Sequence, residues 1–92
     1  MTKSELIEQL TTENDVLNKR EAELIVNSIF DSIGSALVGG DRVEIRGFGS
    51  FSIRERDARE ARNPKSGEVV SIPAKKTPFF KTGKELRTRV DF

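Results

Sequence analysis

The lysines and arginines of the second half of the chain are the residues whose type and spacing suggest chemistry, namely binding to a polyanion. Residues 1–45 carry four basic and nine acidic side chains, whereas residues 46–92 carry twelve basic and six acidic ones. The net charge of +1 therefore conceals an acidic half and a basic half. Lys and Arg concentrated in one part of a chain are typical of phosphate binding. The alternative is an ordinary solvated surface on which acidic and basic residues happen to be separated. The sequence motifs distinguish the two possibilities.

Catalytic chemistry has little support in the composition. The chain has no cysteine and no histidine, which removes disulfides, thiolate metal sites, cysteine nucleophiles and the commonest general base. Glu44 stands between Arg42 and Arg46, where an ion-pairing role is expected rather than a role as a base. We predict a protein that is not an enzyme and that uses no metal, cofactor or small-molecule substrate.

Two glycine-containing segments resemble nucleotide-binding loops only superficially. A dinucleotide or P-loop motif needs a strand, a glycine turn and then a helix. The 47–49 segment lacks a third glycine and precedes a predicted strand, and Gly83–Lys84 lacks the upstream glycine because position 78 is Pro. We therefore reject both nucleotide sites, although the backbone amides of the 47–49 turn could bind a nucleic-acid phosphate.

Two helices are expected in the acidic half. The segment 2–5 has the pattern of a capping box, and the polar stretch 11–15 ends the first helix. A second capping box at 18–21 precedes apolar residues at helical spacing over 22–37. The glycine pair 39–40 ends this helix. The apolar stripe is expected to be core or dimer interface.

The periodicity then changes to that of strands. Val43 and Ile45 alternate with charged residues over 41–46, a tight turn follows at 47–49, and alternation resumes over 50–56. These segments predict an antiparallel hairpin with one apolar and one basic face. The residues expected on the basic face are Arg42, Glu44, Arg46, Ser50, Ser52, Arg54 and Arg56.

An extended arm is predicted next. Residues 57–75 resemble neither helix nor core strand, and the turn at 63–67 makes them a long hairpin with no core beneath it. Residues 76–81 return as a strand that contains Phe79 and Phe80. A third capping box at 82–85 is expected to start a short C-terminal helix.

The size of the chain predicts a single domain over residues 1–92 that needs a second copy or a related subunit. With 92 residues, of which 35% are apolar, one chain is too small to bury a large core. No apolar run approaches the length of a membrane span, and the N-terminus has no signal-peptide stretch. We expect a cytoplasmic protein without a membrane partner.

Four motifs together resemble the HU / integration host factor family of bacterial DNA-bending proteins. They are Met-Thr-Lys-Ser-Glu-Leu-Ile at 1–7, Arg-Gly-Phe-Gly-Ser-Phe at 46–51, Arg-Asn-Pro-Lys-Ser-Gly at 62–67 and Phe-Lys-Thr-Gly-Lys-Glu-Leu at 80–86. The resemblance covers essentially the whole chain. It implies an α+β protomer with two N-terminal helices, a three-stranded antiparallel sheet extended into a two-stranded arm at about 55–76, and a short C-terminal helix, in an intertwined dimer.

Within that family the 42–51 segment looks most like the beta subunit of integration host factor. The resemblance implies that Arg42, Glu44 and Arg46 contribute to sequence preference, with Arg46 in the minor groove and Glu44 orienting the arginines. It also implies that Pro64 wedges between base pairs at a kink, a device known among minor-groove proteins. One departure is Ala61, preceded by Glu60, where the family usually has glycine before the arm-tip motif.

The function expected is that of a nucleoid-associated architectural protein that binds double-stranded DNA through the minor groove and the phosphates, bends it, and supports transcription, recombination and replication. An HU-like homodimer with little sequence preference is one alternative. A protein-interaction module with a basic arm is an alternative of another class. The predicted DNA-contacting residues are Lys3, Ser4, Arg42, Glu44, Arg46, Gly47, Gly49, Arg54, Arg56, Arg59, Arg62, Asn63, Pro64, Lys65, Lys75, Lys76, Lys81 and Lys84.

Overall fold

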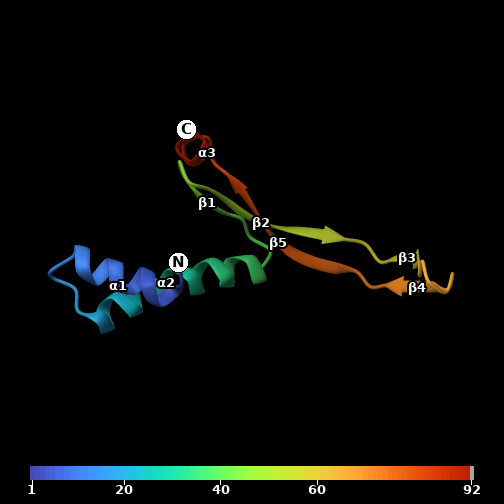
Figure 1. Ribbon diagram of the computed structural model, residues 1–92, viewed down its shortest axis with the longest axis horizontal. Coiled ribbons are helices and arrows are strands. Elements are labelled where there is room, and N and C mark those ends of the chain that lie inside the picture. The colour runs from blue at the N-terminus through green and yellow to red at the C-terminus, as the bar shows by residue number, and fades with distance from the viewer. Residues whose placement is uncertain (92) are drawn as a thin grey trace. The chain divides into compact units, whose positions relative to one another are not determined.

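The computed structural model describes residues 1–91 and has the α+β architecture that the sequence predicts (Figure 1). It forms two compact units, one from Met1 to Ser35 and one that begins at Ala36. No helix among residues 1–91 is long and apolar enough to cross a membrane. The elements in chain order are α1 (Lys3–Glu13), α2 (Lys19–Val38), β1 (Val43–Ile45), β2 (Gly49–Arg56), β3 (Arg59–Arg62), β4 (Val69–Ile72), β5 (Lys75–Thr82) and α3 (Lys84–Val90).

Polar caps begin the first two helices at the predicted positions. The Thr2 hydroxyl accepts a hydrogen bond from the backbone N–H of Glu5 at 3.2 Å, at the start of α1. At the start of α2, the N–H of Glu21 donates to Asn18 Oδ1 at 2.8 Å, and the N–H of Asn18 donates to Glu21 Oε1 at 3.2 Å. Such reciprocal bonds satisfy donors that the first helical turn leaves without partners. Both sequence-predicted caps are therefore confirmed.

The glycine pair at 39–40 ends α2 as predicted. Gly40 has a φ of +80°, which side chains with a Cβ rarely adopt. Its N–H donates to the carbonyl of Leu37 at 3.0 Å, and the N–H of Asp41 donates to the carbonyl of Ala36 at 2.8 Å. This pair of bonds is the Schellman motif, which satisfies the last carbonyls of the helix.

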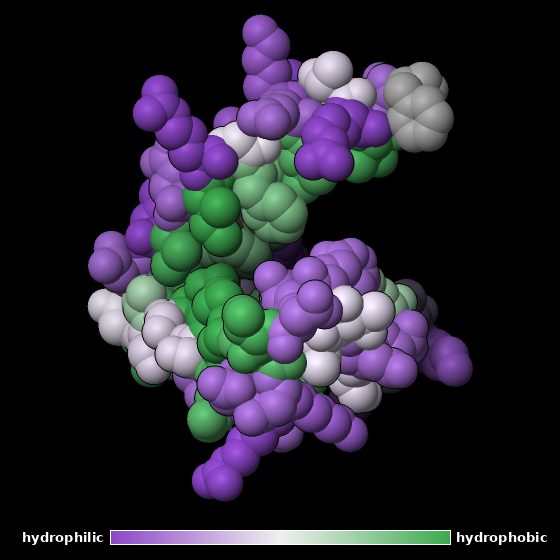
Figure 2. All heavy atoms as spheres, turned by 90° about the vertical axis from the view of Figure 1, so that its left-hand side faces the viewer, coloured by the Kyte–Doolittle hydropathy of each residue, from purple (hydrophilic) through white to green (hydrophobic). Residues whose placement is uncertain are grey.

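The hydrophobic core of the single chain is small. Only Ile7, Ala22 and Val26 are buried apolar residues in the described chain, and Leu6 and Leu10 pack against them. Several large apolar side chains stay open to solvent, as the green atoms at the surface in Figure 2 illustrate. On α2 these include Ile25, Ile29 and Phe30, of which the last two are each 52% exposed. The prediction that one chain cannot complete its own core is confirmed.

The second unit contains two antiparallel sheets. In the three-stranded sheet β2 lies between β1 and β5, and β3 pairs with β4 in a separate two-stranded sheet. Strand β1 is shorter than the predicted 41–46, because only Val43–Ile45 pair with β2. Arg42 precedes β1, and Arg46 lies in the turn that follows it. Pairing stops there because the chain must reverse direction at 46–48.

The capping box expected at Thr82 is wrong. Thr82 is the last residue of β5, and the N-cap of α3 is Gly83, which has no side chain to cap with. The turn before β2 contacts this end of α3 instead. The N–H of Gly83 donates to the carbonyl of Phe48 at 2.8 Å, and the N–H of Leu86 donates to the carbonyl of Gly47 at 3.1 Å. Tertiary hydrogen bonds thus replace the side-chain cap.

Candidate nucleic-acid interface

One face of the β2–β5 pair carries most of the predicted strand contacts, and we call it the basic face. Residues that pair directly across antiparallel strands share a face, and successive residues alternate between faces. In β2 and β5 the pairing joins Ser50 to Lys81, Ser52 to Phe79, Arg54 to Thr77 and Arg56 to Lys75. These eight residues form the basic face. Glu44 of β1 joins it, since Glu44 pairs with Ser50.

The opposite face of these strands is apolar near α3, and its aromatic side chains pack closely behind the basic face. Phe80 packs against Phe51, with ring centroids 4.8 Å apart, and against Phe48, at 5.5 Å. Gly49 is buried beneath them, and a Cβ built on it would lie 2.5 Å from the Phe80 ring and 2.6 Å from the carbonyl oxygen of Lys81. Only glycine fits there without moving the strands.

The turn at 46–48 is fixed by contacts with α3. Gly47 has a φ of +84°, and a Cβ at this position would lie 2.6 Å from Glu85 Oε2. Its conformation favours glycine, whereas the end of the flexible Glu85 side chain could move aside for a Cβ. The structure therefore gives Gly47 a conformational role and Gly49 a packing role, and a DNA contact by either remains a prediction.

Lys75 and Lys76, which the sequence placed together on the arm, lie on opposite faces of β5. Lys75 is on the basic face, opposite Arg56. Lys76 pairs with Glu55, and its Nζ lies 3.7 Å from Glu55 Oε1. Lys76 is partly neutralised by this exposed ion pair, whereas Lys75 adds its charge to the basic face.

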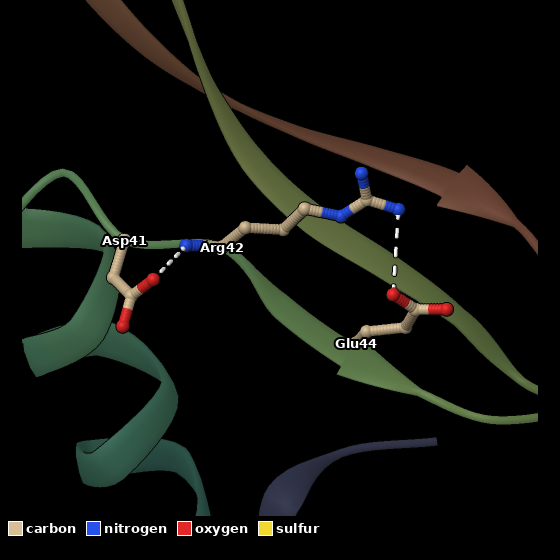
Figure 3. A network of polar contacts seen from close by, with 3 residues as sticks. All are labelled: Asp41, Arg42 and Glu44. Carbon is tan, nitrogen blue, oxygen red and sulfur yellow. Dashed lines mark hydrogen bonds and ion pairs between the residues drawn. The ribbon is translucent and has the colours of Figure 1, made fainter.

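Arg42 and Glu44 form the ion pair expected from their spacing (Figure 3). The Arg42 Nη2 lies 3.6 Å from Glu44 Oε2, and the two side chains are 63% and 69% exposed. The backbone N–H of Arg42 donates to Asp41 Oδ1 at 2.8 Å. Among the described residues, Glu44 has no ion pair with Arg46 within 4.0 Å. The geometry thus shows Glu44 holding one of its two neighbouring arginines. An exposed pair of this kind contributes little to stability, so it leaves Arg42 free to exchange partners.

The arm consists of β3, β4 and the tip loop at 63–68, at the far end of β2 and β5 in Figure 1. Arg62 pairs with Val69 and Arg59 pairs with Ile72, which puts the two arginines on opposite faces of this ribbon. Glu60 shares the face of Arg62 because the two are separated by one residue. The arm is therefore less uniformly basic than the β2–β5 face.

The tip loop holds Pro64 at the end of the arm. The N–H of Asn63 donates to the carbonyl of Glu68 at 2.8 Å, and the Asn63 carbonyl accepts from the N–H of Gly67 at 2.8 Å. The Asn63 side chain accepts from the N–H of Lys65 at 2.9 Å. These three bonds order the loop around Pro64, which is exposed. Asn63 is thus a structural residue of the tip.

The remaining predicted contacts lie at helix starts. Lys3 and Ser4 begin α1 in the first unit, where the Lys3 Nζ donates to Asn27 Oδ1 at 2.9 Å. Lys84 is the first residue of α3, in the second unit. All three are exposed, and their contacts with DNA remain predictions.

Phe79 is a residue of the basic face that the sequence reasoning did not assign. Its ring is half-buried, and the Cζ of Arg54 lies 3.4 Å from the ring centroid. The signal was present in the sequence. Phe79 and Phe80 are consecutive residues of one strand, so only one of them can face the apolar side. The other had to lie among the arginines.

The protein is a small α+β protein with a β-ribbon arm. Two N-terminal helices, a three-stranded sheet with a basic face and a short C-terminal helix complete its architecture. The family model described as bacterial DNA-binding protein matches residues 1–91. The chain belongs to this family of bacterial DNA-binding proteins.

Solved structures agree with the family assignment. HU from Anabaena, crystallised with DNA, is 41% identical with a TM-score of 0.84, and the match covers 98% of this chain and 97% of that one. A mutant HU from Thermotoga maritima is 31% identical with a TM-score of 0.71, covering 98% and 99%. A mutant of transcription factor 1 is 24% identical with a TM-score of 0.65, covering 99% and 91%, and shows the same fold.

Proposed function

We propose that this protein is an architectural DNA-binding protein that acts as a dimer, holds duplex DNA between two arms along the minor groove, and bends it. Two features support this proposal most directly. They are the basic face and the arm that extends from it, which has no hydrophobic core beneath it. An exposed ribbon is costly to order unless a partner covers it. The Anabaena relative was crystallised with DNA, which agrees with this partner.

The dimer is supported by the incomplete core of the single chain. Ile25, Ile29 and Phe30 lie on α2 with 40% or more of their surface exposed. Exposed large apolar side chains that cluster on one helix are typical of an interface between chains. A second copy or a related subunit would cover them and would supply the second arm.

Pro64 is proposed as a wedge between base pairs. Unstacking a base step costs a few kcal/mol, which the additional contacts of bent DNA offset. Through bending, the protein would organise the nucleoid in the cytoplasm and support transcription, recombination and replication.

Salt dependence tests this function against a protein-interaction module. The equilibrium constant for a random 30-base-pair duplex should be measured by fluorescence anisotropy between 50 and 200 mM salt. With six to ten phosphate contacts in a dimer, affinity should fall roughly 10³- to 10⁵-fold over this range. A flat salt dependence, or no binding at 50 mM, would reject DNA as the partner.

We further propose, as a second step, a sequence preference like that of the beta subunit of integration host factor. The 42–46 segment, with Glu44 held 3.6 Å from Arg42, supports it. The rival is an HU-like homodimer with little preference, which the 41% identity to Anabaena HU favours. Selection of bound duplexes from a random pool, with this chain alone, separates the two. A recovered consensus supports the first, and binding without one supports the second.

Arg46→Ala provides a second test of sequence preference. If Arg46 enters the minor groove, removing it should lower affinity for the selected site more than affinity for random duplex. The ratio of these two affinities should fall about ten-fold, since one base contact contributes about 1–3 kcal/mol. The two affinities should be measured at one salt concentration. An equal loss on both duplexes would assign Arg46 to phosphate binding.

A further inference from the structure

The basic face contains one large aromatic ring, and an arginine lies on it. Phe79 pairs with Ser52, so its ring is flanked by small polar side chains and by the charged residues of the face. Arg54 lies two residues along β2 from Ser52, which makes it the diagonal neighbour of Phe79 across the strands. Its Cζ is 3.4 Å from the ring centroid. The two side chains are therefore in direct contact.

This separation determines the orientation of the guanidinium. At 3.4 Å the guanidinium plane must lie roughly parallel to the ring, because an edge-on group would push a nitrogen into the ring carbons. The N–H groups of a guanidinium all point outward in its own plane. A stacked arginine therefore keeps its donors free at the edge, whereas an arginine in a bidentate ion pair has used two of them.

Within residues 1–91, Arg54 makes no ion pair that would compete with this stack. Among the described residues, Arg42 lies near Glu44 and Lys76 lies near Glu55, but no carboxylate lies within 4.0 Å of Arg54. In place of a carboxylate, the face of the Phe79 ring restrains the Arg54 side chain through a cation–π contact. Arg54 is thus restrained without losing charge or donors.

We propose that Phe79 is a positioning residue that pre-orders Arg54 for contact with the DNA backbone. This inference rests on the proposed function and adds a specific residue to it. A free arginine loses side-chain entropy when it binds a phosphate, and a stacked one has already lost part of it. The stack therefore increases affinity for any duplex without adding a contact of its own.

A double-mutant cycle on duplex affinity tests the proposal. Phe79→Leu keeps an apolar side chain of similar bulk but removes the π face, and it should weaken binding about five- to thirty-fold. Pre-ordering of Arg54 can contribute at most the free energy of the stack itself, which is worth about two- to five-fold in affinity per site, and a dimer carries the stack twice. In an Arg54→Ala background the same change should have almost no effect. Phe79→Tyr retains the ring and should keep affinity within about two-fold of the original chain.

Arg56 is the matched control. It lies on the same face of β2 and faces Lys75 rather than an aromatic ring. Phe79→Leu and Arg56→Ala should therefore act additively. If Phe79 only stabilised the sheet, Phe79→Leu would weaken binding equally in all backgrounds and would lower the melting temperature in step. Such additivity with Arg54 would overturn the inference.

The free protein offers a readout that is independent of DNA. Ring-current shielding should move the Arg54 Hδ and Hε resonances upfield in the original chain, and the shift should vanish in Phe79→Leu. Absence of that shift in the original chain would also overturn the inference. Failure of the original chain to bind any duplex would instead reject the proposed function, and the inference with it.

Discussion

Replacing Ile29 with alanine is expected to destabilise the protein severely. In the single chain Ile29 is 52% exposed. If it stayed so exposed, its replacement would change the free energy of unfolding by no more than about 0.5 kcal/mol. If a second chain covers α2, Ile29 becomes a core residue, and its truncation costs about 2–5 kcal/mol in each protomer. Urea unfolding followed by circular dichroism measures the difference. The midpoint should also rise with protein concentration, because dimer formation is coupled to folding.

Leu24→Ala is the matched control on the same helix. Leu24 is 61% exposed and lies beside Ser28, Asp31 and Ser35, almost opposite Ala22 and Val26 around α2. The substitution should lower the free energy of unfolding by no more than about 0.5 kcal/mol, because neither the core nor the proposed interface includes that side of α2. Equal and small effects of the two substitutions, with unfolding independent of concentration, would show that the chain is a stable monomer.

The local elements of this protein could be predicted because each carries its own signal. The capping residues Thr2 and Asn18 begin α1 and α2, and Gly40 ends α2 in the conformation that glycine favours. Alternation of apolar and polar residues, with the turn at 47–49, predicted the hairpin of β1 and β2. These features depend on contacts within a few residues, which is why a single sequence reveals them.

The errors concern features set by tertiary contacts. Thr82 and Glu85 have the spacing of a capping box, yet pairing with Gly49 keeps Thr82 in β5, and the carbonyls of the 46–48 turn satisfy α3. Lys75 and Lys76 lie on opposite faces because successive residues of a strand alternate, and the pairing of Lys75 with Arg56 determines which of the two joins the basic face. The contact of Phe79 with Arg54 depends on the same register of β2 and β5.

Replacing Pro64 with alanine is expected to reduce DNA bending much more than DNA binding. The loop bonds made by Asn63 would remain, because they use its own backbone and side chain rather than Pro64. Alanine is too small to hold two base pairs apart, so half or more of the protein-induced bend should be lost. Affinity should fall less than about ten-fold, since the phosphate contacts that dominate it are unchanged. Energy transfer between dyes at the two ends of a short duplex measures the bend.

Pro73→Ala separates a wedge at the tip from a general effect of proline on the arm. Pro73 lies at the base of the arm, in the connection between β4 and β5, and is also exposed, but it is at the other end of the ribbon from the tip loop. Both substitutions relax the backbone to a similar degree, and only Pro64 is placed to enter the stack. If the two variants lose the same amount of bending, stiffness of the arm rather than intercalation sets the bend. If Pro64→Ala bends DNA as fully as the original chain, the kink must come from the phosphate contacts of the arm and the basic face alone.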